Sequence, residues 1–197
     1  AVLSGTNMFQ ICFKDPNQGA ASAQYIYDKK ICTKIAIIWK NDDVYSKGIY
    51  ETFAAKAEEL GLPVVSVTTF ADGNDTDFSV QLSKVAESGA ELLFLPNYYN
   101  DDALILQQAA DINLEIKYFG VDGMDGLLAV ENFDTSLAEG CMLLTPFAAT
   151  SQDDATVKFV EAYGAANNGE IPNQFAADAY DVLYAIKAAV EDAGVTP

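Results

Sequence analysis

The sequence predicts an α/β fold in which a parallel sheet is flanked by helices on both faces. Short apolar or β-branched runs alternate with longer amphipathic runs in a βαβαβαβ order, with a repeat of about 25–30 residues. Runs such as KIAIIW (34–39) and ELLFLP (91–96) are apolar at every position that would face a helix layer. A strand that is covered on both faces requires this pattern, whereas a half-exposed strand alternates.

The first strand and helix are predicted over 34–39 and 45–61. The helix is supported by apolar residues at helical spacing, namely Ile49, Phe53, Ala57 and Leu60. Gly61 follows the last of them and is expected to end the helix, because glycine readily adopts the left-handed conformation of a C-cap.

The second strand and helix are predicted over 63–70 (PVVSVTTF) and 75–89. One face of this helix would carry Phe78, Leu82 and Val85. Either Asp75 or Thr76 is expected to cap its first turn, because both side chains can accept hydrogen bonds from free N–H groups.

The third unit combines a strand over 91–96 with a helix over 100–113, whose leading aspartates suit a helix N-terminus. A strand over 117–121 follows, then a short helix after Gly126, and a last strand over 141–147 (CMLLTPF). The alternation of strand and helix therefore continues to residue 147.

The flanks lack this alternation. Residues 8–13 (MFQICF) predict one strand and residues 14–19 (KDPNQG) a turn. Two helices are predicted over 153–168 and 174–193, with no strand between them. Helices without a sheet of their own must pack on something else, so we expect the two ends to be parts of a second, incomplete domain of a truncated chain.

Composition excludes several classes of partner. The 197 residues include 29 acidic and 11 basic side chains, for a net charge of −18 at pH 7. Nucleic acids and anionic membrane surfaces both require clustered cations, so neither is an expected partner. No run approaches the ~18 apolar residues of a membrane span.

Histidine is absent, which excludes Ser-His-Asp and Cys-His catalysis and histidine metal sites within these residues. The three cysteines, Cys12, Cys32 and Cys141, form no C-x-x-C pair. Cys12 and Cys141 lie in apolar runs and are expected to be buried free thiols.

Candidate binding residues follow the predicted strands, because ligands of open parallel sheets bind at the carboxyl ends of the strands. Tyr45 follows the first strand, Tyr98 and Tyr99 the third, and Asp122 the fourth. Each also has a purely structural interpretation: loop tyrosines often lie on the surface, and Asp122 could accept turn N–H bonds. Adjacent tyrosines point in different directions, so we expect one of the pair to face the edge and the other to pack.

Other chemistries find little support. GVDGMDG (120–126) is not a G-x-G-x-x-G phosphate loop, and DGNDTD (72–77) lacks the central glycine and terminal glutamate of a calcium loop. Asp122 and Asp125 could serve a glycosidase, but nothing else supports one. A covalent nucleophile would need a base other than histidine. No enzyme, cofactor or metal site is predicted.

Five segments and an opening stretch together resemble one family. They are KIAIIWKNDDVYSKGIYETFAAKAEELG, DTDFSVQLSKV, LLFLPNYYNDDALILQQA, YFGVDGMDG and FAADAYDVLYAI, preceded by MFQICFKDPNQGAASAQYI. Nearly end to end, the chain resembles the solute-binding proteins of branched-chain amino-acid ABC importers, of the leucine/isoleucine/valine type, in the periplasmic binding protein type I family.

The resemblance implies two α/β lobes that close on a ligand in the cleft between them. Residues 20–147 would form the second lobe, while 1–19 and 148–197 would be fragments of the first lobe and the hinge. The family's segments that bind the ligand carboxylate would precede residue 1. We therefore expect this chain alone to bind amino acids weakly or not at all, and to self-associate, as a homodimer for instance, through exposed apolar surface.

The same resemblance implies roles for individual residues. Asp122 in FGVDG matches the acid that accepts the ligand's ammonium group, and Tyr98 matches the first tyrosine of the family's pair. Tyr45 in YSKG and Phe175 match aromatic residues of the pocket. Two departures were expected to reshape that pocket: Asn97, where a glycine is common, and Met124, where a large aromatic residue is common.

The implied function is extracytoplasmic, in the periplasm or on a cell-surface lipoprotein: binding of a free amino acid and delivery to the membrane permease. A binder or sensor of another small solute, such as an amide, urea or an aromatic acid, is the alternative within the same fold. A ligand without an amino group would have little use for Asp122. An α/β enzyme is the alternative from another class.

Overall fold

The structure is a computed structural model that describes residues 5–194, and the chain divides into two units. Unit 1 consists of residues 14–144. Unit 2 consists of the described residues 5–13 and 145–194. The assignment of these units to a second lobe and to pieces of a first lobe stays a prediction.

Unit 1 is built on a five-stranded sheet in the order β2-β1-β3-β4-β5. The strands are β1 (Ile35–Lys40), β2 (Val64–Phe70), β3 (Leu92–Leu95), β4 (Lys117–Gly120) and β5 (Met142–Leu143). Every neighbouring pair runs parallel. The predicted α/β fold with a parallel sheet is therefore confirmed.

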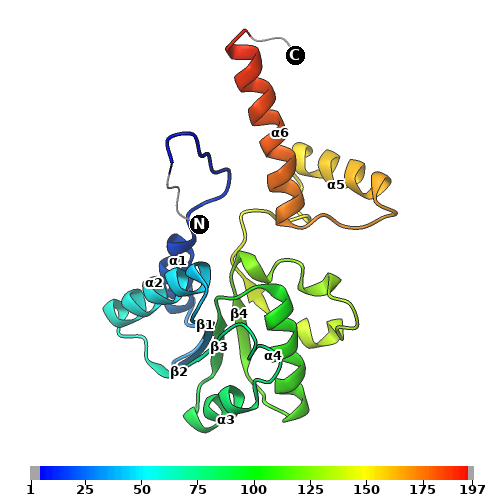
Figure 1. Ribbon diagram of the computed structural model, residues 1–197. Helices are drawn as coiled ribbons and strands as arrows, with labels where there is room; N and C mark the ends of the chain where they lie inside the picture. Colours follow the sequence, from blue (N-terminus) through cyan, green and yellow to red (C-terminus); the bar gives the residue numbers. More distant parts are fainter. Residues whose placement is uncertain (1–4, 195–197) are drawn as a thin grey trace. The chain divides into compact units, whose positions relative to one another are not determined.

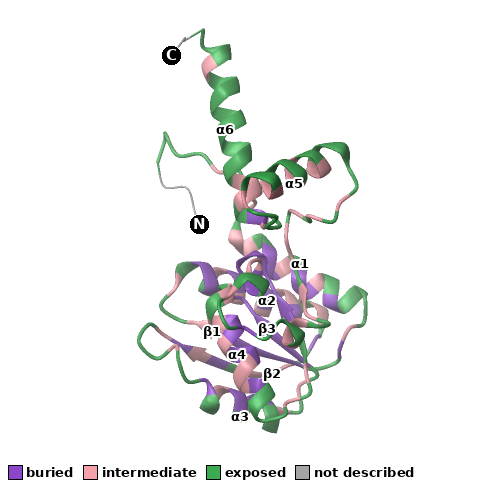
Figure 2. Cartoon of the chain, turned by 90° about the vertical axis from the view of Figure 1, so that its right-hand side faces the viewer, coloured by how far each residue is buried: buried purple, intermediate pink, exposed green. Residues whose placement is uncertain are grey.

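Helices cover both faces of this sheet (Figure 1). On one side lie α1 (Asp15–Asp28) and α2 (Val44–Leu60), and on the other α3 (Ser79–Ser88) and α4 (Tyr99–Asp111). The alternating side chains of β1 and β3 reach both layers and are almost completely buried. Ile35, Ile37, Leu92 and Phe94 face α1 and α2, while Ala36, Ile38, Leu93 and Leu95 face α3 and α4. The continuous burial along these strands (Figure 2) explains their unbroken apolar sequence.

Most predicted boundaries within unit 1 hold to within a few residues. Gly61 caps α2 in the left-handed conformation, with φ of 66°, as expected. The predicted caps of the next helix are wrong, because α3 begins at Ser79 rather than near Asp75 or Thr76. Instead Asp77 accepts a hydrogen bond from the Ser79 N–H at 2.9 Å.

The predicted turn over residues 14–19 is wrong, because residues 15–19 form the start of helix α1. Pro16 occupies the first turn of α1, where a missing N–H has no consequence. The buried stripe of α1 consists of Gln18, Gly19, Ser22, Ala23 and Ile26. Three of these five residues are polar or lack a side chain, so apolar periodicity does not predict a helix here.

The predicted strand over residues 8–13 is also wrong. These residues are irregular, and within its described residues unit 2 contains no strand with which they could pair. A strand needs a partner for its backbone N–H and C=O groups, so an apolar run alone does not form one. The last strand is shorter than the predicted 141–147, since β5 pairs only through Met142 and Leu143.

The described part of unit 2 has two long helices, α5 (Asp154–Ala166) and α6 (Gln174–Asp192), close to the predicted ranges. An aromatic contact joins them, because the ring centroids of Phe159 and Tyr180 are 4.8 Å apart. Phe147, before α5, adds a second contact with a centroid 5.8 Å from that of Phe159. Much of α6 stays exposed, as its colour in Figure 2 shows.

Short 3₁₀ turns complete unit 1, namely η1 (Asp122–Met124), η2 (Leu127–Ala129) and η3 (Thr135–Ala138). The second is the short helix expected after Gly126. Within residues 5–194, no helix is long and apolar enough to cross a bilayer.

The three cysteines are free thiols, but their burial differs from expectation. Cys32 is buried, whereas Cys12 and Cys141 are only partly buried. Cys12 lies in the irregular segment 8–13, and Cys141 precedes the two-residue strand β5, so neither has the full cover of a central strand.

Gly19 sets how closely α1 approaches α2. A Cβ atom there would overlap the Ile49 carbonyl oxygen and the Thr52 hydroxyl, and would lie 2.7 Å from the Phe53 amide nitrogen. The Thr52 hydroxyl also donates to the Pro16 carbonyl at 2.6 Å. Because most of these atoms belong to the backbone, they cannot move aside independently.

We expect Gly19→Ala to lower the free energy of unfolding by about 1–3 kcal/mol, because it forces α1 away from α2. Gly48→Ala is the matched control: it is also in a helix of this pair, and its added Cβ would lie 3.7 Å from Pro16, an ordinary contact. That control should be neutral or stabilising by up to ~1 kcal/mol. Urea unfolding measures both, and equal stability of the two variants would contradict the close-approach argument.

Candidate functional site

The carboxyl edge of the sheet gathers three of the predicted binding residues. Tyr45 lies in the first turn of α2, Tyr98 is the N-cap of α4, and Asp122 opens η1. These segments follow β1, β3 and β4, whose parallel order places their carboxyl ends together. The edge is therefore formed by loops that are distant in the sequence.

Asp122 and Tyr45 are in direct contact. The Tyr45 hydroxyl donates to Asp122 Oδ1 at 2.5 Å and accepts from the Gly123 N–H at 2.8 Å. Both side chains are nearly buried, with 7% of Asp122 and 9% of Tyr45 exposed. The predicted proximity of these two residues is thus confirmed, while their contact with a ligand stays a prediction.

Tyr98 stacks on Tyr45. The ring centroids are 4.6 Å apart with an interplanar angle of 21°, and 42% of Tyr98 is exposed. Tyr99 instead packs against the core cluster on the α4 side of the sheet. As expected, one tyrosine of the pair is at the edge and the other packs.

Gln18 is a member of this cluster that the sequence did not reveal. Its side chain is 1% exposed, and its Nε2 donates to Asp122 Oδ1 at 2.7 Å. Its Oε1 accepts from the Asp122 backbone N–H at 3.0 Å. The only sequence signal for Gln18 is its place on the buried face of α1, and the segment 14–19 also has the composition of a turn.

Gly123 permits the close approach of these groups. A Cβ at this position would lie 2.6 Å from the Tyr45 hydroxyl and would overlap the Asn97 carbonyl oxygen. Any larger residue would therefore push Tyr45 away from Asp122.

The two tyrosines are hydrogen-bond donors across the physiological pH range. Burial raises the pKa of Tyr45 far above its ordinary value, and the neighbouring Asp122 carboxylate raises it further. Burial also raises the pKa of Tyr98, with smaller contributions from Asp43 and Asp122. Both hydroxyls consequently keep their protons beside the acid.

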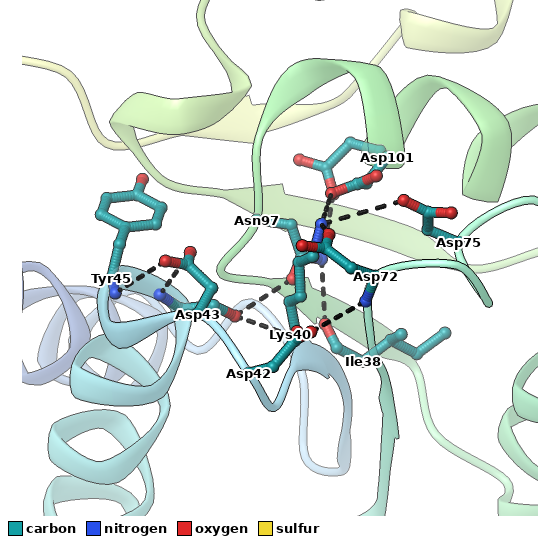
Figure 3. A network of polar contacts seen from close by, with 11 residues as sticks. Ile38, Lys40, Asp42, Asp43, Tyr45, Asp72, Asp75, Asn97 and Asp101 are labelled. Carbon is teal, nitrogen blue, oxygen red and sulfur yellow. Dashed lines mark hydrogen bonds and ion pairs between the residues drawn. The ribbon is translucent and has the colours of Figure 1, made fainter.

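A second polar network supports the loops that carry the tyrosines (Figure 3). Asn97 is 1% exposed; its Nδ2 donates to the Ile38 carbonyl at 3.0 Å and to Asp102 Oδ1 at 3.2 Å. The Ser46 hydroxyl donates to Asn97 Oδ1 at 3.2 Å and accepts from the Lys40 N–H at 2.9 Å. Asn97 therefore connects β1, α2 and α4 directly beside Tyr45 and Tyr98.

Both expected departures, Asn97 and Met124, are buried. Asn97 is a buried linker between strands and helices rather than a side chain of the open edge. Met124 is 1% exposed in the core cluster beneath α4, and its sulfur lies against Gly120. The side chain of Met124 points into the core, and the expectation that it reshapes the pocket stays a prediction.

An acidic group surrounds Lys40 at the end of β1 (Figure 3). The Lys40 ammonium pairs with Asp72 at 2.5 Å and lies 3.9 Å from both Asp75 and Asp101. The hydrogen bond with Asp72 raises the pKa of Lys40 above its usual value, against the opposing effect of burial. Across the described residues, no group of three or more cysteines, aspartates or glutamates could hold a metal ion.

Phe175, the fourth predicted binding residue, belongs to unit 2. It lies in the first turn of α6 and is 40% exposed. The preceding Gln174 is 1% exposed and accepts from the Thr145 hydroxyl at 3.1 Å, within the same unit. The pocket role of Phe175 remains a prediction.

Comparison with known proteins identifies relatives of one kind. The sequence profile of the family described as "Periplasmic binding protein" matches residues 3–197. A Leu/Ile/Val-binding protein homolog 3 of Brucella melitensis is 28% identical over 191 residues, covering 96% of this chain and 50% of that protein. The chain spans about half the length of the curated relatives it matches.

Two solved structures are similar in both sequence and fold. The leucine-binding protein LivK of Thermotoga maritima has a TM-score of 0.82 and 30% identity, with 93% of this chain and 52% of that chain covered. LivJ of Streptococcus pneumoniae, in complex with isoleucine, has a TM-score of 0.81 and 31% identity, with 90% and 50% covered.

Asp102 is the titratable carboxyl group of the network centred on Asn97. It is completely buried, and its Oδ2 has no hydrogen-bond partner among the described residues. Burial raises its pKa well above the ordinary value; the Asn97 hydrogen bond opposes this shift and Asp101 adds to it. The folded state therefore binds a proton that the unfolded chain releases at a lower pH. The resulting stability is complete below the unfolded pKa and is lost as pH rises toward the folded pKa.

We expect the free energy of unfolding of the wild type to fall relative to that of Asp102→Asn as pH rises from about 4 toward neutrality. Urea unfolding of both proteins over this range measures the difference. Asp77→Asn is the control: hydrogen bonds from Ser79 lower the pKa of Asp77, so its contribution is lost only below about pH 4, and its difference from the wild type should stay constant over this range. A constant difference between wild type and Asp102→Asn would contradict the expectation.

Proposed function

Because the chain belongs to the periplasmic binding protein family, we propose that it is the solute-binding component of an ABC importer and binds a free amino acid. The relatives carry names of branched-chain amino-acid binders, such as the Leu/Ile/Val-binding protein homolog and the leucine-binding LivK. The proposed role is non-enzymatic and extracytoplasmic, with delivery of the amino acid to membrane permease subunits. Since the chain spans about half the length of these relatives, the proposal concerns the intact protein.

The observation that carries the proposal is the Asp122 carboxylate at the carboxyl edge of the sheet. In a chain with a net charge of −18, a further buried acid has no general electrostatic benefit. A primary ammonium has three N–H donors and forms charge-assisted hydrogen bonds with a carboxylate. Asp122 therefore has the chemistry to receive the amino group of the ligand.

The tyrosine pair supports the same assignment. Tyr98 rests one ring face on Tyr45 while 42% of the residue stays exposed beside the acid. Aromatic faces attract cations, by about 0.5–2 kcal/mol according to exposure. An acid and an aromatic face at one edge both favour a cationic group and disfavour a solute whose recognised group is an anion.

We expect Asp122→Asn to weaken binding of L-leucine to the intact protein by ~30-fold or more, because loss of one partner of a buried charge pair costs about 2–5 kcal/mol. Titration calorimetry with L-leucine and with 4-methylpentanoate, which lacks the amino group, measures the effect. The variant should bind 4-methylpentanoate as the wild type does.

The matched control is Asp111→Asn, at the opposite end of α4 from Tyr98, which should leave leucine binding unchanged. Equal affinity of the wild type for leucine and 4-methylpentanoate would reject amino-group recognition. That result would favour another small solute, such as an amide, urea or an aromatic acid.

Self-association of this chain is a separate proposal about its partners. Leu183, Tyr184 and Ile186 of α6 are 67%, 55% and 55% exposed, an unusual density of large apolar side chains on one helix. We expect light scattering to show concentration-dependent association of this chain, and Leu183→Glu to reduce it because a charge would be buried at the contact. A monomer at every concentration would contradict the proposal.

A further inference from the structure

We propose that Gln18 is a positioning residue for the Asp122 carboxylate, and that it orients this acid for the amino group of the ligand. The inference rests on the proposed function, since it concerns the same acid. It assigns a role to a residue of α1, a helix that contributes none of the predicted binding residues.

The geometry is a two-point contact between one side-chain amide and one residue. Gln18 Nε2 donates to Asp122 Oδ1 at 2.7 Å, and Gln18 Oε1 accepts from the Asp122 N–H at 3.0 Å. A single hydrogen bond would leave the carboxylate free to rotate about its side-chain torsions. Contacts to both the side chain and the backbone of Asp122 fix the acid relative to the loop that carries it.

Few side chains could replace this amide. A carboxamide has both a donor and an acceptor, and the two are used here on the same residue. Glutamate would place a second carboxylate against Asp122, and methionine or leucine would supply neither hydrogen bond. Lysine or arginine would supply donors but would also neutralise the acid.

Two uncharged donors reach Asp122 Oδ1 from neighbouring helices. They are the Gln18 amide at 2.7 Å and the Tyr45 hydroxyl at 2.5 Å. Neutral donors orient a carboxylate without cancelling its negative charge.

The position of Gln18 is itself tightly determined. The adjacent Gly19 allows α1 to rest against the α2 backbone at Ile49 and Phe53. Tyr45 lies one turn before Ile49 on α2, so α1 and α2 present Gln18 and Tyr45 to the same oxygen of Asp122. The packing of the two helices thus sets the direction from which the amide approaches.

The test compares two probes in the intact protein, L-leucine and 4-methylpentanoate, by titration calorimetry. Gln18→Met keeps the side-chain volume and removes both hydrogen bonds. We expect it to weaken leucine binding by tenfold or more and to leave 4-methylpentanoate binding unchanged, because only leucine has an amino group for Asp122. Gln18→Ala should lower the ratio of leucine affinity to 4-methylpentanoate affinity to the same extent. Its small side chain leaves room for water, so it serves as the second variant if methionine fits poorly.

Gln24→Met is the matched control. Gln24 is also on α1 and also donates to an aspartate, with Nε2 2.8 Å from Asp28 Oδ1, but this hydrogen bond is exposed to solvent. This variant should bind both probes as the wild type does.

Three results would overturn the inference, and they differ from one another. Equal weakening of both probes by the Gln18 variants would assign Gln18 a merely structural role. Unchanged leucine affinity in these variants, beside a wild type that prefers leucine and an Asp122→Asn variant that does not, would overturn the inference alone. A wild type that does not prefer leucine over 4-methylpentanoate would overturn the proposed function and this inference with it.

Discussion

The polar edge of unit 1 depends on one constraint, the hydrogen bonding of the nearly buried Asp122 carboxylate. Asp122 is 7% exposed, and its Oδ1 accepts from Tyr45 of α2 and from Gln18 of α1. A buried charge without such partners would be strongly unfavourable. This one group therefore couples the register of two helices to the loop that follows β4.

Two glycines make this arrangement sterically possible. Gly19 removes the side chain that would separate α1 from α2, and Gly123 removes the one that would displace Tyr45. In both places an added Cβ would meet a backbone carbonyl oxygen, which cannot move aside unless its helix or loop moves as well. The polar cluster and the close helix packing consequently depend on each other.

The second network, centred on Asn97, provides rigidity of a different kind. It joins β1, α2 and the start of α4 because one buried amide donates to Ile38 and Asp102 and accepts from Ser46. Ser46 and Asn97 are the immediate neighbours of Tyr45 and Tyr98, so the same hydrogen bonds that tie these elements together also place the two stacked rings. An edge built on such fixed elements presents its acid and its aromatic face with little rearrangement of unit 1.

The sequence alone determined the fold class and most of the edge. Alternation of strand and helix implies parallel strands, and parallel strands bring their carboxyl ends together, so Tyr45, Tyr98 and Asp122 could be assigned to one edge without coordinates. The tertiary structure decided what local pattern cannot express. Gln18 contacts Asp122 across a separation of 104 residues, Met124 turns into the core, and residues 8–13 form no strand. Periodicity indicates which face of a segment is buried and which faces water. A hydrogen bond between distant segments depends on how those segments pack. A strand forms only where another strand lies beside it to pair with its backbone.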